Sequence, residues 1–386
     1  MPAVSGMFPD QKLGRPMACL REFAPGSQGF ARMGRGVRTR FEQDDLPVPS
    51  LVRLALRLLG CHDLGRAEKL AWEMPFEFRG VACSIALEKF GLRLYVEPSP
   101  GADSATLATD IVRNLQKAIG SLERAVLKDL ATQQMALGNV TIANQYPSLN
   151  NMYRFFREAA AALYGEEERP LVADSTFSEI FADFTQYMGR QQRAFYNTVA
   201  MIQAYYSRLE HTLVLLLPFS GYDPAAESLK DFIGDIWRKK FVRIFGLFDP
   251  ASKRFHDRLC EVSEDYRNTY SHGGFDKGGA ALHFQIPHIG LVPAALSDIR
   301  DKPHFRFVPI ERENFQQVCD LFDKLDEWMR SSASWFGMQW VEGGLDLRFD
   351  QDFLDELRRA MASHEEFDIF TAQHGCNQDR ASNMDW

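Results

Sequence analysis

The sequence predicts a mainly α-helical protein: a C-terminal helical bundle with a short β insertion, preceded by an N-terminal region of helices and strands (α+β). Three observations support this fold class. Apolar residues recur at spacings of three and four through most of the second half, the period of helices that bury one face. Between residues 83 and 96 they alternate with polar or small residues, the period of strands. Extended stretches between 281 and 308 interrupt the helical pattern.

The 386 residues are enough for two domains, and we divide the chain into four predicted segments. Residues 1–46 are rich in Gly, Pro and Arg and lack periodicity, which predicts a poorly ordered basic leader. Such a leader either contacts nucleic acid or a partner, or is a solvated tail. The glycine, glutamates and proline of residues 165–170 form the candidate linker. We therefore expect an α+β region of unassigned role over 47–168, a helical domain over 169–342, and a helix with a loose tail over 343–386.

In the N-terminal half, periodicity predicts four helices and one hairpin. The helices are expected near residues 51–59, 65–72, 104–135 and 149–163. Gly138 can end the third of them. Alternating apolar residues from Cys83 to Leu87 and from Leu92 to Val96 predict two strands, with residues 88–91 as the turn of a β-hairpin.

In the C-terminal half, apolar stripes predict a series of helices. They cover residues 177–209, 229–245, 251–272 and 315–329, followed by a helix over 353–362. Residues 281–291 and 305–308 are expected to be extended. Amphipathic helices in this order can bury their apolar stripes against one another in a bundle, with the extended residues as an insertion.

The helix predicted over 251–272 carries the side chains best suited to chemistry. Its apolar stripe takes every third or fourth residue from Phe255 to Tyr266. At about 100° per residue, Arg267, Asn268 and His272 fall on the opposite side and face away from the core of the helix. They offer an imidazole that titrates near neutral pH, a guanidinium that suits phosphate oxygens, and an amide that can orient either.

This arrangement resembles the Arg-x(4–6)-His motif of the HEPN superfamily (higher eukaryotes and prokaryotes nucleotide-binding), in which a polar residue commonly follows the arginine. The resemblance covers roughly residues 170–340, where the motif lies near a helix end between other long helices. It implies an all-α domain that forms a homodimer and brings two motifs together. It also implies a metal-independent endoribonuclease, very often in antiviral defence or in a toxin–antitoxin system.

The chemistry of RNA cleavage suggests a role for each motif residue. Attack by the ribose 2′-hydroxyl needs a proton acceptor, a positive charge at the attacked phosphate and a proton donor for the leaving oxygen. We assign His272 as the general acid/base, Arg267 as the phosphate clamp, and Asn268 as the residue that orients the substrate or His272. A homodimer would present two copies of each group around one phosphodiester.

Two other interpretations of the motif remain open. A non-catalytic HEPN-type module would use these residues to bind a nucleotide or RNA, or to form a dimer interface. Alternatively, His272 and Gly273 only end the helix, and Arg267 pairs with Glu264 one turn earlier. The protein would then be a scaffold.

A basic segment directly precedes the motif. Residues 237–258 contain seven Lys or Arg against two Asp, with aromatic residues between them. Such a patch can follow a phosphate backbone, or it can be the solvated face of a packed helix. The candidate RNA-binding residues are Arg238, Lys239, Lys240, Arg243, Lys253, Arg254 and Arg258.

The overall composition limits the remaining possibilities. The formal net charge of −8 predicts no general attraction to nucleic acid, so RNA binding has to depend on a local patch. Six scattered cysteines lack the spacing of a zinc site, and we expect no metal and no cofactor. No apolar run approaches the roughly 20 residues of a membrane helix, and we expect a cytoplasmic protein without membrane contact. The expected partners are RNA, a second copy, and an antitoxin or sensor protein.

Overall fold

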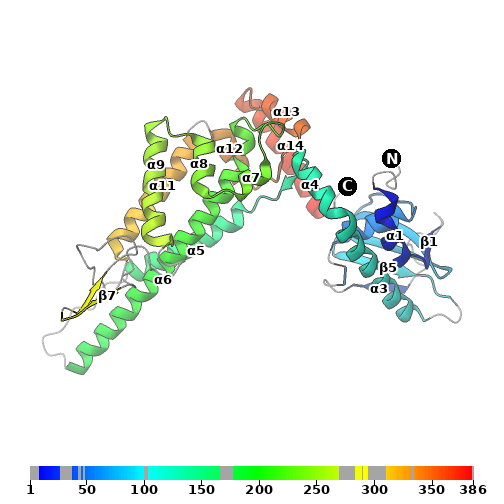
Figure 1. The fold of residues 1–386 in the computed structure, drawn as a ribbon, viewed down its shortest axis with the longest axis horizontal. Coiled ribbons are helices and arrows are strands. Elements are labelled where there is room, and N and C mark those ends of the chain that lie inside the picture. Colours follow the sequence, from blue (N-terminus) through cyan, green and yellow to red (C-terminus); the bar gives the residue numbers. More distant parts are fainter. Residues whose placement is uncertain are drawn as a thin grey trace. The chain divides into compact units, whose positions relative to one another are not determined.

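The computed structural model describes residues 8–26, 37–41, 45–46, 48–99, 103–165, 177–268, 283–288, 290–293, 310–331 and 334–384. It is mainly helical, with a small antiparallel sheet in its N-terminal part (Figure 1), which confirms the predicted fold class. The chain forms two compact units. The first consists of Met1–Ala136 and Ala372–Trp386, and the second of Leu137–Thr371.

The first unit is built on a five-stranded antiparallel sheet with the order β1-β3-β4-β5-β2. Its strands are β1 (Phe23–Pro25), β2 (Val37–Arg40), β3 (Leu70–Phe78), β4 (Val81–Glu88) and β5 (Gly91–Val96). The hairpin predicted from the alternating residues is confirmed, because Glu88 pairs with Gly91 around a two-residue turn. The helix expected over 65–72 is wrong, since β3 begins at Leu70.

Three helices supply the apolar partners of this sheet: α1 (Asp10–Cys19), α2 (Pro49–Leu58) and α3 (Ser104–Leu122). Alternate residues of a strand point to the same face, and those from Trp72 to Phe78 are buried together with Ile111 and Leu115 of α3. The α3 helix continues through a π-helical turn, η2 (Glu123–Leu127), into α4 (Lys128–Ala136). The predicted long helix over 104–135 is therefore confirmed.

The prediction of a poorly ordered leader over 1–46 is wrong for residues 8–26 and 37–41. They form α1, β1 and β2, and Leu13, Leu20 and Phe23 are buried in the core of the first unit. Gly14 and Pro16 both lie inside α1 and are poor helix formers, so local propensity does not predict this helix. Packing against the sheet stabilises it instead.

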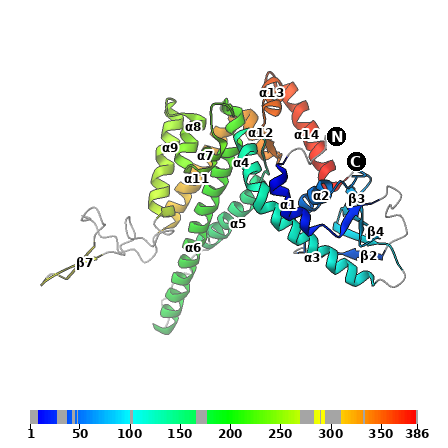
Figure 2. The same cartoon turned by 45° about the vertical axis from the view of Figure 1, so that its right-hand side comes forward.

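The second unit is helical (Figures 1 and 2). Its main helices are α5 (Tyr146–Gly165), α6 (Phe177–Leu215), α7 (Leu229–Gly234), α8 (Trp237–Phe245), α9 (Pro250–Val262), α11 (Arg312–Ser331), α12 (Trp335–Glu342) and α13 (Gln351–Ala360). A short antiparallel pair joins β6 (Thr141–Ile142) to β9 (Leu347–Arg348). The helix predicted over 229–245 is broken into α7 and α8, because Asp235 and Ile236 are extended.

The α5 helix runs antiparallel to α6. The backbone N–H of Gln145 donates to His211 Nε2 at one end (2.9 Å), and the ring of Tyr153 packs on that of Tyr205 further along (5.2 Å between centroids). Since α5 buries its apolar face in the second unit, the division falls between Ala136 and Leu137 and not in the predicted linker at 165–170. The N-terminal part of α6 extends beyond the other helices of this unit (Figure 1).

Two further predictions concern the insertion and the C-terminus. Of the stretch predicted to be extended over 281–291, the described residues form a hairpin of β7 (His283–Ile286) and β8 (Gly290–Pro293), whereas residues 305–308 lie outside the described residues. The loose tail is wrong, because α14 (His364–Asn383) continues almost to the end of the chain. The carbonyl of Met384 accepts a hydrogen bond from the backbone N–H of Lys69 (3.0 Å), which ties this end to the first unit.

Candidate functional site

The predicted motif begins where α9 ends. After Val262 the helix continues as one π-helical stretch, η4 (Ser263–Asn268), and Arg267 lies in its last turn. Asn268 is the last described residue of this stretch, and His272 lies outside the described residues. The structure therefore places Arg267 and leaves its alignment with His272 as a prediction.

Arg267 faces α6, which differs from the outward direction predicted for it. Its Nε donates to Gln203 Oε1 (3.4 Å), and its guanidinium carbon lies 5.0 Å from the ring centroid of Tyr206. The outward direction was calculated with the α-helical angle of 100° per residue, whereas a π-helical turn contains more residues and rotates less at each one. The side chain is half-buried as a result.

The α6 residues that contact Arg267 are themselves fixed. Gln203 Nε2 donates to the backbone carbonyl of Arg267 (3.2 Å), so the two residues exchange hydrogen bonds in both directions. Tyr206 is fully buried, and its hydroxyl donates to the carbonyl of Leu259 (2.5 Å). Burial raises the pKa of Tyr206, so this hydroxyl is protonated and the ring under Arg267 is neutral.

Among the described residues Glu264 forms an ion pair with Arg238, and not with Arg267 as in the alternative interpretation. Glu264 accepts a hydrogen bond from Arg238 Nη2 of α8 (3.1 Å). This ion pair links η4 to α8. Both groups that hold the Arg267 side chain, an amide and a phenol ring, are uncharged.

Most of the predicted basic patch is paired with carboxylates. Arg243 makes a bidentate contact with Glu227 (2.7 Å), and Lys240 is only 2% exposed and donates to Glu210 (2.7 Å). Lys240 therefore cannot contact RNA from this position. The other pairs are Arg238 with Glu264, Lys239 with Asp235, Lys253 with Asp257 and Arg258 with Glu261. Arg254 is exposed and lies over the ring of Phe255 (5.7 Å).

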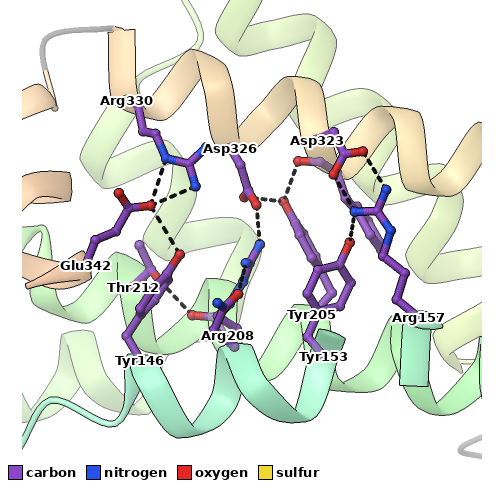
Figure 3. Close-up of polar contacts among 12 residues, drawn as sticks. Tyr146, Tyr153, Arg157, Tyr205, Arg208, Thr212, Asp323, Asp326, Arg330 and Glu342 are labelled. Atoms are coloured by element: carbon purple, nitrogen blue, oxygen red, sulfur yellow. Dashed lines mark hydrogen bonds and ion pairs between the residues drawn. The ribbon is translucent and has the colours of Figure 1, made fainter. Parts of the chain in front are cut away.

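A second polar cluster lies between α5, α6 and α11, and sequence reasoning missed it. It lines a cavity of about 570 Å³. Arg208 is at its centre (Figure 3): Nη2 donates to Asp326 (2.6 Å), and Nη1 donates to Asn150 (2.5 Å). The hydroxyl of Tyr205 also donates to Asp326 (3.0 Å). We name this set, with the flanking pairs described next, the Arg208 cluster.

Two further arginine–carboxylate pairs flank Arg208 in Figure 3. Arg157 makes a bidentate contact with Asp323 (2.5 and 2.6 Å), and Arg330 donates to Glu342 (2.8 Å). The cavity is lined by four arginines and four acidic residues, so its formal charge is zero. Because these cations are already matched by anions, the cluster holds three helices together and has no excess charge for a ligand.

Burial shifts the pKa of several groups in the Arg208 cluster. It raises the pKa of Asp326, an effect that the neighbouring Arg208 only partly opposes. It also raises the pKa of Tyr205 and Tyr153, which therefore stay protonated. The sequence signal for this cluster is Asp323, Asp326 and Arg330 at spacings of three and four in α11, beside its apolar stripe.

Within the described part of the chain, no three His, Cys, Asp or Glu side chains are grouped so that they could hold a metal ion. Across those same residues, no helix combines the length and the apolar character needed to cross a membrane.

Comparison with known proteins returns no relative. No protein family matches the chain, and no curated protein or solved structure is similar to it. The fold is that of a mainly helical protein of two compact units, and the HEPN resemblance depends on the sequence pattern of residues 170–340 alone.

Proposed function

We propose that the protein is a metal-independent endoribonuclease of HEPN type that acts as a homodimer. Arg267 binds the attacked phosphate, His272 transfers the protons, and Asn268 orients the substrate or His272. The products are a 2′,3′-cyclic phosphate and a 5′-hydroxyl. The observation that carries the proposal is the way in which Arg267 is held, by neutral groups only.

A phosphate clamp needs a positive charge that is fixed in place but not cancelled. Among the described residues, Nη1 and Nη2 of Arg267 have no hydrogen-bond partner, whereas Nε is held by Gln203. The planar guanidinium can then present two parallel N–H groups to two phosphate oxygens. A charge held by neutral groups also stabilises a phosphorane-like transition state more strongly than a charge already paired with a carboxylate.

The biological setting belongs to the same proposal. A role in antiviral defence, or as the toxin of a toxin–antitoxin system, agrees with the family that the motif resembles. An antitoxin or sensor protein would then control the nuclease, which we place in the cytoplasm. The first unit is a separate compact body and is a candidate for the sensing part.

The proposal is tested with single-stranded RNA in excess EDTA. We expect the wild-type chain to cleave it, and Arg267→Ala and His272→Ala each to lower the rate by at least about 100-fold, the typical loss for a phosphate-stabilising or proton-transferring group. Arg359→Ala, which removes an exposed arginine of α13, is the matched control and should retain the wild-type rate. Circular dichroism verifies folding.

Two results would contradict this proposal. One is cleavage by either motif variant at the wild-type rate. The other is binding of RNA without cleavage by the wild-type chain, which would favour a non-catalytic binding module. The chemical ends of the products, read by phosphatase and kinase treatment, separate 2′-hydroxyl attack from hydrolysis.

A further inference from the structure

We propose that Gln203 and Tyr206 of α6 are positioning residues, which aim the guanidinium of Arg267 without neutralising it. The inference rests on the proposed function, because it assigns Arg267 a phosphate to bind. The two residues lie three positions apart, so they share one face of α6. Both contact Arg267, one at its edge and one at its planar face.

Gln203 fixes the rotation of the guanidinium plane. Its carbonyl oxygen accepts from Arg267 Nε (3.4 Å), while its amide donates to the Arg267 backbone carbonyl (3.2 Å). An arginine at the last described turn of a helix would otherwise sample several rotamers. Because Nε is occupied, the edge formed by Nη1 and Nη2 is the one left to face a ligand.

Tyr206 fixes the tilt of the same plane. Its ring lies under the guanidinium carbon at 5.0 Å, within the range of a cation–π contact. The ring cannot move easily, because its hydroxyl is bonded to Leu259 and its edge packs against Trp237 (5.3 Å between centroids). The contact attracts the cation and still leaves its full charge available for an anion.

The identity of residue 203 follows from this function. A glutamate there would hold Arg267 more strongly, because a charged acceptor makes a shorter and stronger bond. It would also cancel the positive charge next to the phosphate. Glutamine is therefore the residue that satisfies both requirements, and Gln203→Glu separates positioning from simple stabilisation.

The experiment compares four full-length proteins: wild type, Gln203→Glu, Gln203→Met and Gln192→Met. Gln192 is the control glutamine, because it also belongs to α6, but it is exposed and its amide donates to Tyr196 (2.8 Å) instead of contacting Arg267. We expect kcat/KM for RNA cleavage in EDTA to fall about 10- to 100-fold in both Gln203 variants: in Gln203→Met because Arg267 is misplaced, and in Gln203→Glu because the carboxylate cancels its charge. Gln192→Met should stay within about twofold of wild type.

A second readout does not depend on activity. In protein with 15N-labelled arginine, the Nε–H resonance of Arg267, assigned by its loss in Arg267→Ala, reports the bond to Gln203. We expect its hydrogen exchange to become faster in Gln203→Met and slower in Gln203→Glu, with no change in Gln192→Met. If the wild-type chain does not cleave RNA, the proposed function fails, and this resonance still tests the positioning.

Tyr206 is tested with a pair of variants. Tyr206→Phe keeps the ring and should keep kcat/KM within about threefold, whereas Tyr206→Leu should lower it about 10-fold, the loss of a partly buried cation–π contact. The inference is overturned if Gln203→Glu retains wild-type cleavage, or if the Arg267 Nε–H exchange is the same in all four proteins. It is also overturned for Tyr206 if the Phe and Leu variants, both folded, cleave equally well.

Discussion

Arg208 belongs to α6 and Arg267 contacts that helix, but the two arginines are held in opposite ways. Arg208 is almost fully buried, paired with Asp326 and surrounded by three tyrosine rings. Arg267 is half-buried and is held by an amide and one ring. A cation paired with a buried carboxylate stabilises the fold. A cation held by neutral groups retains a charge that can bind an anionic ligand. The predictions below test this difference.

The largest expected effect is in the Arg208 cluster. Asp326→Ala leaves Arg208 buried without its carboxylate, and we expect the free energy of unfolding to fall by about 3–5 kcal/mol. Urea denaturation followed by circular dichroism measures it. The double variant Asp326→Leu, Arg208→Met removes both charges and should recover part of the loss. If the single variant were no less stable than the double variant, the Arg208–Asp326 ion pair would not be what holds this cluster together.

Removing the second arginine should cost much less stability. Arg267→Met loses one long hydrogen bond (3.4 Å) to an uncharged acceptor and one cation–π contact at a half-buried position, which together amount to about 1 kcal/mol. The same denaturation experiment checks it, with Arg359→Met as the control. A loss of unfolding free energy as large as that of Asp326→Ala would contradict this prediction, because Arg267 would then stabilise the fold as Arg208 does.

His211 of α6 should make the free energy of unfolding depend on pH. Burial lowers the pKa of His211 from its ordinary value of 6.5, and its neutral Nε2 accepts a hydrogen bond from the Gln145 backbone. The unfolded chain therefore binds more protons below pH 6.5 than the folded chain does, so stability is present above pH 6.5 and is lost as the pH falls below it. His211→Gln should flatten this loss between pH 7 and pH 5. An unchanged slope would exclude His211 as its source.

The smallest effect is expected on the exposed face of α8. The Lys239 ion pair with Asp235 is exposed, so Lys239→Ala should change the free energy of unfolding by less than about 0.5 kcal/mol. If Lys239 also contacts an RNA phosphate, the slope of log Kd against log salt should fall by about one. Fluorescence anisotropy at several salt concentrations measures the slope. An unchanged slope removes this lysine from the predicted RNA-binding patch.

The sequence predicted those elements whose stability comes from local patterns. The hairpin at 83–96 and the helix from Ser104 to Ala136 both follow from the spacing of apolar residues, and the structure confirms them. The helix of the first 46 residues was not predictable in this way. Gly14 and Pro16 weaken its local signal, and only the sheet against which it packs makes it stable.

The candidate site was predictable only in part, for a related reason. The sequence provides the arginine, the amide and the histidine of the motif at their spacing. Which way Arg267 points depends on a π-helical turn, and a regular α-helical projection does not contain that turn. The alternative interpretation, in which Arg267 pairs with Glu264, could not anticipate that Arg238 of α8 pairs with that carboxylate.

By itself, the amino-acid sequence determined the helical periods, the hairpin register and the presence of the motif, because each depends on residues within a few positions of one another. Only the tertiary structure decided where the two units divide and which residues Arg208 and Arg267 contact. Gln203 and Arg267 are 64 positions apart, and Arg208 and Asp326 are 118 apart. Such pairs form only when helices pack. Packing buries Arg208 beside a carboxylate, and it leaves Arg267 half-buried among neutral groups with a charge that can bind a ligand.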